Sequence, residues 1–240
     1  MRILIVNDDG IYSPGILALA EVASEFGTVT IVAPDIERSS TGHAVTHSRP
    51  LSYRRTPIAG FEAFRVDGTP ADCVAVGFSI GDKADVVLSG INLGLNLGNS
   101  MWHSGTLAGA KQAALMGSRG IALSAAVGNA EPDFQRLKPH VSEALRAILP
   151  DAGLPLVNVN FPLSPRGTRW TRQSVRHYDG KVVPIKDPLG RQLYWFTVVP
   201  VEETEEGTDR WTVERGLTSF TPLRLNLTDE AALEKATRDA

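Results

Sequence analysis

The chain has 240 residues, of which 42% are hydrophobic and 21% are charged, and its formal net charge is -3. This length allows one substantial core with an appendage, because single domains commonly run to about 100–200 residues. The charge excludes the broad basic surface that binds a nucleic-acid backbone, so we expect no polymeric nucleic acid as a partner.

Two further features of the composition limit the class of protein. No apolar run approaches the roughly 20 residues that span a bilayer, and no secretion signal precedes the first strand, so we expect a cytoplasmic protein without membrane attachment. Cys73 is the single cysteine. A disulfide within the chain and a thiolate zinc cluster are therefore excluded, and any metal must be held by oxygen or imidazole.

Short β-branched runs alternate with helical patterns up to about residue 160. Strands are expected at 2–6, 29–33, 85–89, 121–125 and 156–160, and helices at 15–26, 71–78, 106–117 and from about 139 to 149. Thr69 and Pro70 are a cap and an opening proline for the second of these helices. Strands that are apolar on both sides need helices on both faces, so the pattern predicts a three-layer α/β domain with a mostly parallel sheet over residues 1–165.

Residues 166–240 have a different pattern, with prolines, glycines and short aromatic or β-branched runs that predict a hairpin-rich extension and a short amphipathic segment after Leu227. The aromatic residues of this extension exceed what a short hairpin can bury: Trp170, Tyr194, Trp195, Phe196 and Trp211. They pack either against the parent domain or in an interface between subunits.

Four polar stretches follow strands of the predicted sheet, where open parallel sheets bind their ligands. The first is Asn7-Asp8-Asp9-Gly10, directly after the first strand. Two adjacent carboxylates repel each other unless a cation or protons lie between them, and Gly10 permits a tight turn. A hard divalent cation explains the pair, although these four residues are also ordinary turn formers.

The next two stretches can complete such a cation site. Residues 34–42 are rich in hydroxyl groups, which supply neutral oxygen ligands and phosphate contacts. Residues 90–99 contain three asparagines and three glycines, and we expect them to form neither helix nor strand and to wind around a ligand. An Asn amide oxygen suits a hard cation and its nitrogen suits a phosphate oxygen, while a left-handed Asn-Gly turn is the competing interpretation.

The fourth stretch, His103-Ser104-Gly105-Thr106, precedes a predicted helix. Free backbone N–H groups at a helix start, with hydroxyl groups beside them, form an anion site without a basic side chain, although helix capping by Ser104 or Thr106 explains the same residues. His103 is a candidate general acid, but a histidine that only packs beside the helix start is the favoured interpretation. Together the four loops predict a cation site and a phosphate site at one edge of the sheet.

Several motifs of the chain resemble one known family. In chain order they are MRILIVNDDGIYSPGI, the APD loop that ends in Ser39, VDGTPADCV, LSGINLGLNLG and HSGT before a helix, followed by TRQSVRHYDG, EEGTDRW and TPLRLNLTD. They resemble the survival protein E (SurE) family of metal-dependent 5′/3′-nucleotidases. The resemblance implies a Rossmann-like domain with a protruding β-hairpin, a C-terminal segment swapped between subunits of a homodimer or homotetramer, and a role in stress survival.

The resemblance also implies a specific set of site residues. The metal ligands correspond to Asp8, Asp9, Ser39 and Asn92, and the phosphate site corresponds to Asn96, Ser104 and Thr106, with Gly105 between the last two. One Mg²⁺ or Mn²⁺ ion per subunit is implied. The chain departs from the family pattern where Ser40 replaces a frequent glycine and where Asn99-Ser100 replaces frequent acidic residues.

The predicted function is metal-dependent hydrolysis of nucleoside 5′- and 3′-monophosphates, in which Asp8 and Asp9 hold the cation and orient or deprotonate water. An all-oxygen ligand set disfavours zinc and copper. The alternative is a non-catalytic nucleotide- or phosphate-binding regulatory module. A receiver domain is disfavoured because residues 85–89 continue into Gly90 without an acceptor aspartate, and a haloacid-type hydrolase because residues 7–10 lack its aspartate spacing.

Overall fold

A computed structural model describes residues 1–128, 133–175, 178–200 and 204–238. Its strands are β1 (Arg2–Val6), β2 (Thr28–Pro34), β3 (Tyr53–Arg55), β4 (Glu62–Val66), β5 (Val86–Leu93), β6 (Arg119–Ala125), β7 (Leu156–Phe161), β8 (Thr168–Trp170), β9 (Tyr178–Lys186), β10 (Gln192–Pro200) and β11 (Thr218–Pro222). Its helices are α1 (Pro14–Ala23), α2 (Pro70–Ile80), the 3-10 helix η1 (Gly98–Trp102), α3 (Gly105–Leu115), α4 (Phe134–Ile148), α5 (Asp209–Glu214) and α6 (Glu230–Arg238).

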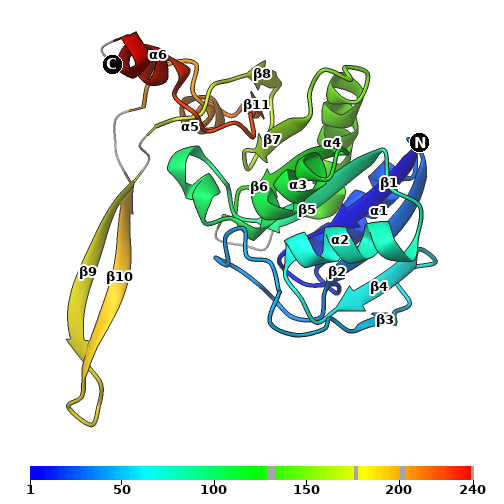
Figure 1. The fold of residues 1–240 in the computed structure, drawn as a ribbon, viewed down its shortest axis with the longest axis horizontal. Helices are drawn as coiled ribbons and strands as arrows, with labels where there is room; N and C mark the ends of the chain where they lie inside the picture. The colour runs from blue at the N-terminus through cyan, green and yellow to red at the C-terminus, as the bar shows by residue number, and fades with distance from the viewer. Residues whose placement is uncertain (129–132, 176–177, 201–203, 239–240) are drawn as a thin grey trace.

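Nine strands form one sheet in the order β3-β4-β2-β1-β5-β6-β7-β11-β8. The neighbours from β4 to β7 are parallel, whereas β3 and β11 run antiparallel to β4 and β7. Helices α1 and α4 pack on one face of this sheet and α2 and α3 on the other (Figure 1). The predicted three-layer α/β domain with a mostly parallel sheet is confirmed.

The two faces of β1 show why the central strands are continuous apolar runs. Ile3 and Ile5 lie in the core beneath α1 and α4, while Leu4 and Val6 lie in the core beneath α2 and α3. Successive side chains of a strand point to opposite faces, so a strand covered by helices on both sides needs an apolar residue at every position.

The structure differs in detail from the predicted elements. The hairpin-rich pattern predicted for residues 166–240 also contains a helix, α5, which Thr208 caps by accepting a hydrogen bond from the Trp211 N–H (3.4 Å). Residues 90–99 were expected to form neither helix nor strand, but β5 runs on to Leu93 and η1 begins at Gly98.

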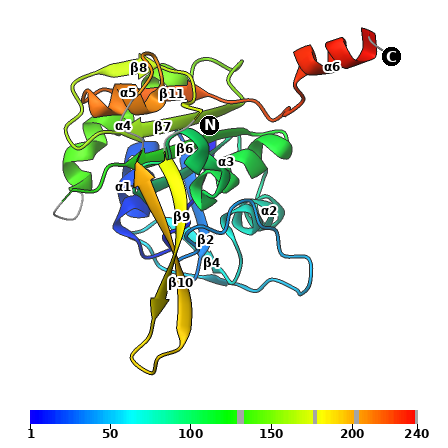
Figure 2. The same ribbon diagram turned by 90° about the vertical axis from the view of Figure 1, so that its left-hand side faces the viewer.

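The hairpin of β9 and β10 projects from the body of the molecule, and α6 lies away from the main sheet (Figure 2). On the hairpin Tyr194 is 70% exposed and Trp195 is 62% exposed, so packing against the parent domain is wrong for them. Trp170 is 48% exposed, and its ring meets Phe220, another residue of the extension, edge to face at 5.4 Å between ring centroids.

The division of the chain at residue 165 stays a prediction, but the structure adds a detail to it. Strands β8 and β11, which follow that position, pair within the nine-stranded sheet. Among the described residues, no helix is long and apolar enough to cross a membrane.

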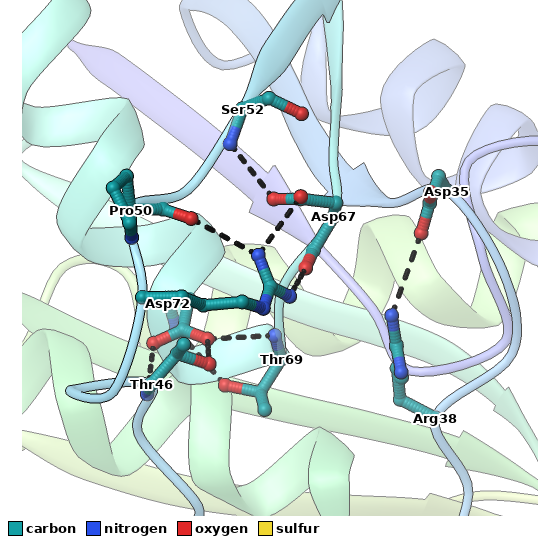
Figure 3. A network of polar contacts seen from close by, with 9 residues as sticks. Asp35, Arg38, Thr46, Pro50, Ser52, Asp67, Thr69 and Asp72 are labelled. Atoms are coloured by element: carbon teal, nitrogen blue, oxygen red, sulfur yellow. Dashed lines mark hydrogen bonds and ion pairs between the residues drawn. The ribbon is translucent and has the colours of Figure 1, made fainter.

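A polar network fixes the long loop between β2 and β3 (Figure 3). Asp72 accepts hydrogen bonds from the Thr46 N–H (2.9 Å), the Thr46 hydroxyl (2.7 Å) and the Thr69 N–H (2.9 Å). Thr69 in turn accepts from the Asp72 N–H, which completes the capping box of α2 and confirms the predicted cap. Burial alone would raise the pKa of Asp72, but these hydrogen bonds outweigh it and lower the pKa.

We expect Asp72→Ala to lower the free energy of unfolding by about 2–3 kcal/mol, because Thr46 and Thr69 lose their acceptor and α2 loses its capping box. Urea denaturation at constant m-value measures the change. Asp82→Ala, which removes an exposed ion pair with Arg2, is the matched control and should cost less than about 1 kcal/mol. Equal losses in the two variants would contradict the role of the network.

Candidate active site

Asp8 lies just beyond the end of β1 and is 4% exposed. Its Oδ1 accepts a hydrogen bond from the Thr106 hydroxyl (2.7 Å) in the first turn of α3. A Cβ atom on Gly105 would lie 2.8 Å from Asp8 Oδ2, so the absence of a side chain at Gly105 lets the start of α3 approach the carboxylate. Burial raises the pKa of Asp8, and hydrogen bonds from Thr106 offset part of the effect.

Asp9 is the second carboxylate of the pair and is partly buried. Its Oδ2 accepts a hydrogen bond from the Leu93 N–H (3.2 Å). Burial and the charge of Asp8 raise the pKa of Asp9 to about 6. In the described part of the chain, neither carboxylate forms an ion pair, and only neutral donors stabilise them.

Asn92 approaches this pair from the end of β5. The pairing of β5 with β6 shifts register between Ser89 and Asn92, a bulge that changes the direction of the strand where it reaches the site. The amide nitrogen of Asn92 donates to the Gly94 carbonyl (2.8 Å), so its amide oxygen is the atom left for a ligand. Gly10 has φ +94°, as the tight turn after Asp9 requires.

The loop after β2 packs against Asp8. The Arg38 N–H donates to the Asp8 carbonyl (2.7 Å), and the Ser39 hydroxyl donates to Glu37 Oε1 (2.7 Å). The Glu37 charge further raises the pKa of Asp8 and Asp9, so a third carboxylate lies near the pair. Glu37 was not predicted as a site residue, although an acidic residue in this loop was a visible signal in the sequence. Ser40 has φ +59°, the left-handed conformation that glycine favours.

The predicted phosphate site (Asn96, Ser104, Gly105 and Thr106) is brought together beside Asp8. Asn96 Nδ2 donates to the Ser124 hydroxyl (2.9 Å) and lies 3.4 Å from the Thr106 hydroxyl. Ser104 accepts a hydrogen bond from the Leu107 N–H (3.0 Å), so it caps α3 as the competing interpretation states. A continuous set of hydrogen bonds therefore links Asp8, Thr106 and Asn96.

Two asparagines that support this site were missed. Asn160 Oδ1 accepts from the Asn96 N–H (2.8 Å), and Asn158 Nδ2 donates to the Asn96 carbonyl (2.7 Å). Both are buried at alternate positions of β7, so they share one face of the sheet. Two polar residues on one face of an otherwise apolar buried strand were the available signal, because buried amides need partners.

In the described part of the chain, no histidine forms a hydrogen bond or an ion pair with Asp8 or Asp9. His103 is exposed, and its backbone carbonyl accepts from the Gly42 N–H (3.0 Å). His43 Nε2 pairs with Gln112 Oε1 (2.9 Å). Among the described residues no three His, Cys, Asp or Glu side chains cluster as a metal site. The side chains nearest to Asp8 and Asp9 offer hydroxyl, amide and carboxylate oxygens, which suit a hard divalent cation.

The fold and this site define a Rossmann-like α/β protein with an acidic, oxygen-rich centre at the carboxyl edge of its sheet. The family model of survival protein SurE matches residues 3–180, and the chain belongs to this family.

Relatives of known name align over nearly the whole chain. A protein named 5′-nucleotidase SurE 1 from Thermus thermophilus is 47% identical, over 98% of this chain and 96% of the relative. A 5′-nucleotidase SurE from Deinococcus radiodurans is 44% identical, over 95% and 88%. The crystal structure of the SurE protein from Aquifex aeolicus superposes with a TM-score of 0.85 at 37% identity, covering 99% of both chains.

The raised pKa of Asp9 predicts that, in the metal-free protein, this carboxyl group lowers the free energy of unfolding by an amount that depends on pH. Folding disfavours the charged form, so the cost is absent below about pH 4, grows as the pH rises towards 6, and is complete above it. This difference between the ordinary pKa of an aspartate and the pKa of Asp9 corresponds to about 3 kcal/mol of folding free energy for a fully buried group. Solvent access to Asp9 reduces it to about 1–2 kcal/mol.

We therefore expect Asp9→Asn, relative to the wild-type protein, to gain about 1–2 kcal/mol of stability between pH 4 and pH 7.5. Urea denaturation with a chelator present, at both pH values, measures the change. A stability difference that stays constant, or falls, over this pH range would contradict the electrostatic account of the pair.

Proposed function

We propose that the protein is a metal-dependent phosphomonoesterase that hydrolyses nucleoside 5′- and 3′-monophosphates to nucleoside and phosphate. The observation that carries this proposal is the carboxylate pair of Asp8 and Asp9, which has no cationic partner in the described structure and lies against the start of α3. Such a pair supports cation binding, and the helix start supports binding of an anion beside the cation.

Asp8, Asp9, Ser39 and Asn92 are the residues that would hold one Mg²⁺ or Mn²⁺ ion. Their donors fit a hard cation, because two carboxylates, a hydroxyl and a free amide oxygen are all oxygen ligands. When bound, such a cation screens the charge of the phosphate ester and makes water a better nucleophile at neutral pH.

The other residues of the site bind and orient the phosphate group. The Ser104 hydroxyl and the backbone at Gly105 present neutral donors where the non-bridging phosphate oxygens carry charge in a loose transition state. Asn96 and Thr106, whose donor groups are engaged with Ser124 and Asp8, would exchange these hydrogen bonds for phosphate oxygens. Asp9 is less buried than Asp8 and is the better placed of the two to orient the attacking water and accept its proton.

The names of the relatives support nucleotides as the substrate class. The Thermus and Deinococcus relatives are named 5′-nucleotidases, which supports hydrolysis of 5′-monophosphates by this chain. Hydrolysis of 3′-monophosphates rests on the family resemblance of the motifs. The non-catalytic binding module is not favoured, because these relatives are named as enzymes.

We also propose that the protein is a homo-oligomer, a dimer or a tetramer, in which the hairpin and the C-terminal segment meet other subunits. Exposed aromatic and aliphatic side chains lie along the hairpin, including Val182, Tyr194, Trp195 and Phe196. An isolated two-stranded hairpin is at best marginally stable in water, so a partner that covers these side chains supports its conformation. No residue of α6 is buried within its own chain.

With AMP and Mn²⁺ we expect the wild-type protein to release phosphate and EDTA to abolish the release. Asp8→Asn should lower kcat/KM on the order of 10³-fold, because a carboxylate ligand is lost beside the phosphate site. Asp82→Asn, at an exposed position outside the site, is the matched control, and 3′-AMP tests the second substrate. Near wild-type turnover by Asp8→Asn would contradict the metal role, and metal-independent saturable AMP binding without release would support the binding module.

Replacing Tyr194, Trp195 and Phe196 together by Ser should reduce the molecular mass measured by light scattering, because the hairpin loses its apolar contact surface. Leu163→Ser, at a position that is also exposed but outside the hairpin, should leave the mass unchanged. A monomeric wild-type protein, or an unchanged mass in the triple variant, would contradict the hairpin interface.

A further inference from the structure

A buried carboxylate outside the site joins the C-terminal part of the chain to the loop that carries Asn96. Asp209, the first residue of α5, is 0% exposed. Its Oδ2 accepts from the Gly98 N–H (2.8 Å), and its Oδ1 accepts from the Ser174 N–H (3.0 Å) and the Arg210 N–H (2.7 Å). Three backbone N–H groups therefore converge on this one carboxyl group, and the bond to Gly98 joins segments that lie 111 residues apart.

Gly98 is held on both sides of its backbone by residues from the C-terminal part of the chain. Gln173 Nε2 donates to the Gly98 carbonyl (3.0 Å), while Asp209 accepts from its N–H. Gly98 has φ +53°, so the chain turns here into η1 with a conformation that glycine adopts without strain. We call Asp209 and Gln173 the Gly98 clamp.

The clamp lies between two parts of the phosphate site. Asn96 precedes Gly98 by two residues, and η1 leads from Gly98 to Ser104 at the start of α3. Asn158 and Asn160 hold the backbone of Asn96 from β7. The clamp is thus the second anchor of the same loop, and it fixes the path from Asn96 to Ser104.

We propose that Asp209, together with Gln173, is a positioning residue for the phosphate site: it holds Gly98 so that Asn96 and the start of α3 converge on one phosphate group. The proposal rests on the proposed function. Capping of α5 does not require this carboxylate, because the Thr208 hydroxyl accepts from the Trp211 N–H. The hydrogen bond from the Gly98 N–H to Asp209 Oδ2, which joins residues 111 positions apart in the chain, therefore stabilises the loop rather than the helix.

The variant Asp209→Asn breaks this link selectively. If the amide oxygen keeps the two hydrogen bonds from Ser174 and Arg210, the amide nitrogen faces the Gly98 N–H, and two donors oppose each other. Thr208→Val is the matched control, because it removes a buried hydroxyl at the same helix start but makes no change at Gly98.

The experiment measures AMP hydrolysis with Mn²⁺, inhibition by inorganic phosphate, and hydrogen exchange of residues 94–102. For Asp209→Asn we expect about a tenfold rise in the KM for AMP and in the inhibition constant of phosphate, and faster exchange of the loop. The Mn²⁺ concentration for half-maximal activity should change less than these two constants, because in the described structure Asp209 and Gln173 form no hydrogen bond with Asp8, Asp9 or Asn92. A general loss of structure would instead change the Mn²⁺ requirement as strongly as the KM for AMP and the inhibition constant of phosphate.

Unchanged phosphate inhibition and loop exchange in Asp209→Asn, or equal changes in Thr208→Val, would overturn the proposal. If Asp209→Asn does not fold, Gln173→Leu removes the other half of the clamp, and unchanged values in that variant would overturn it as well. A wild-type protein that releases no phosphate would refute the proposed function instead, and loop exchange would still decide whether the clamp holds Gly98.

Discussion

The carboxylates of Asp8 and Asp9 are adjacent in the chain, and in the described structure only neutral donors face them. The repulsion between these two negative charges explains much of the structure of the site. Gly105 has no side chain where α3 meets Asp8, the Thr106 hydroxyl donates to Asp8, and the Leu93 N–H donates to Asp9. These contacts reduce the electrostatic cost of the pair without removing it, since the pKa values of both carboxylates stay raised. A divalent cation would remove the remaining cost.

The topology of the sheet explains why the site forms at this place. From β1 the chain moves through β2 to β4 on one side and then returns to β5 on the other side of β1. The strand order therefore changes direction between β1 and β5, and ligands of open α/β sheets bind at such points, beyond the carboxyl ends of the strands. Asp8 and Asp9 follow β1, and Asn92 lies at the end of β5.

The loops that form the site could be predicted from the sequence, whereas the buried side chains that hold these loops in place could not. Asp8, Asn92 and Ser104 lie where strands end or a helix begins, and such positions have local signals in composition and spacing. The link between Asn160 and Asn96 spans 64 residues and the link between Asp209 and Gly98 spans 111, so tertiary packing alone creates them. The helix α5 was missed because three of its six residues, Trp211, Thr212 and Val213, are aromatic or β-branched and favour strands in isolation. Thr208 caps its start. Ser39 was chosen over its neighbours only through the family resemblance.

The C-terminal part of the chain has two roles in this account. It contributes exposed apolar side chains on the hairpin, and it holds the Asn96 loop through Asp209 and Gln173 at the base of that hairpin. We propose that a divalent cation binds between Asp8 and Asp9. Crystals grown with Mn²⁺ test it by anomalous diffraction. We expect one anomalous peak per chain, within coordination distance of oxygens from Asp8, Asp9 and Asn92. A map without a peak at this position, in crystals that contain Mn²⁺, would contradict the account.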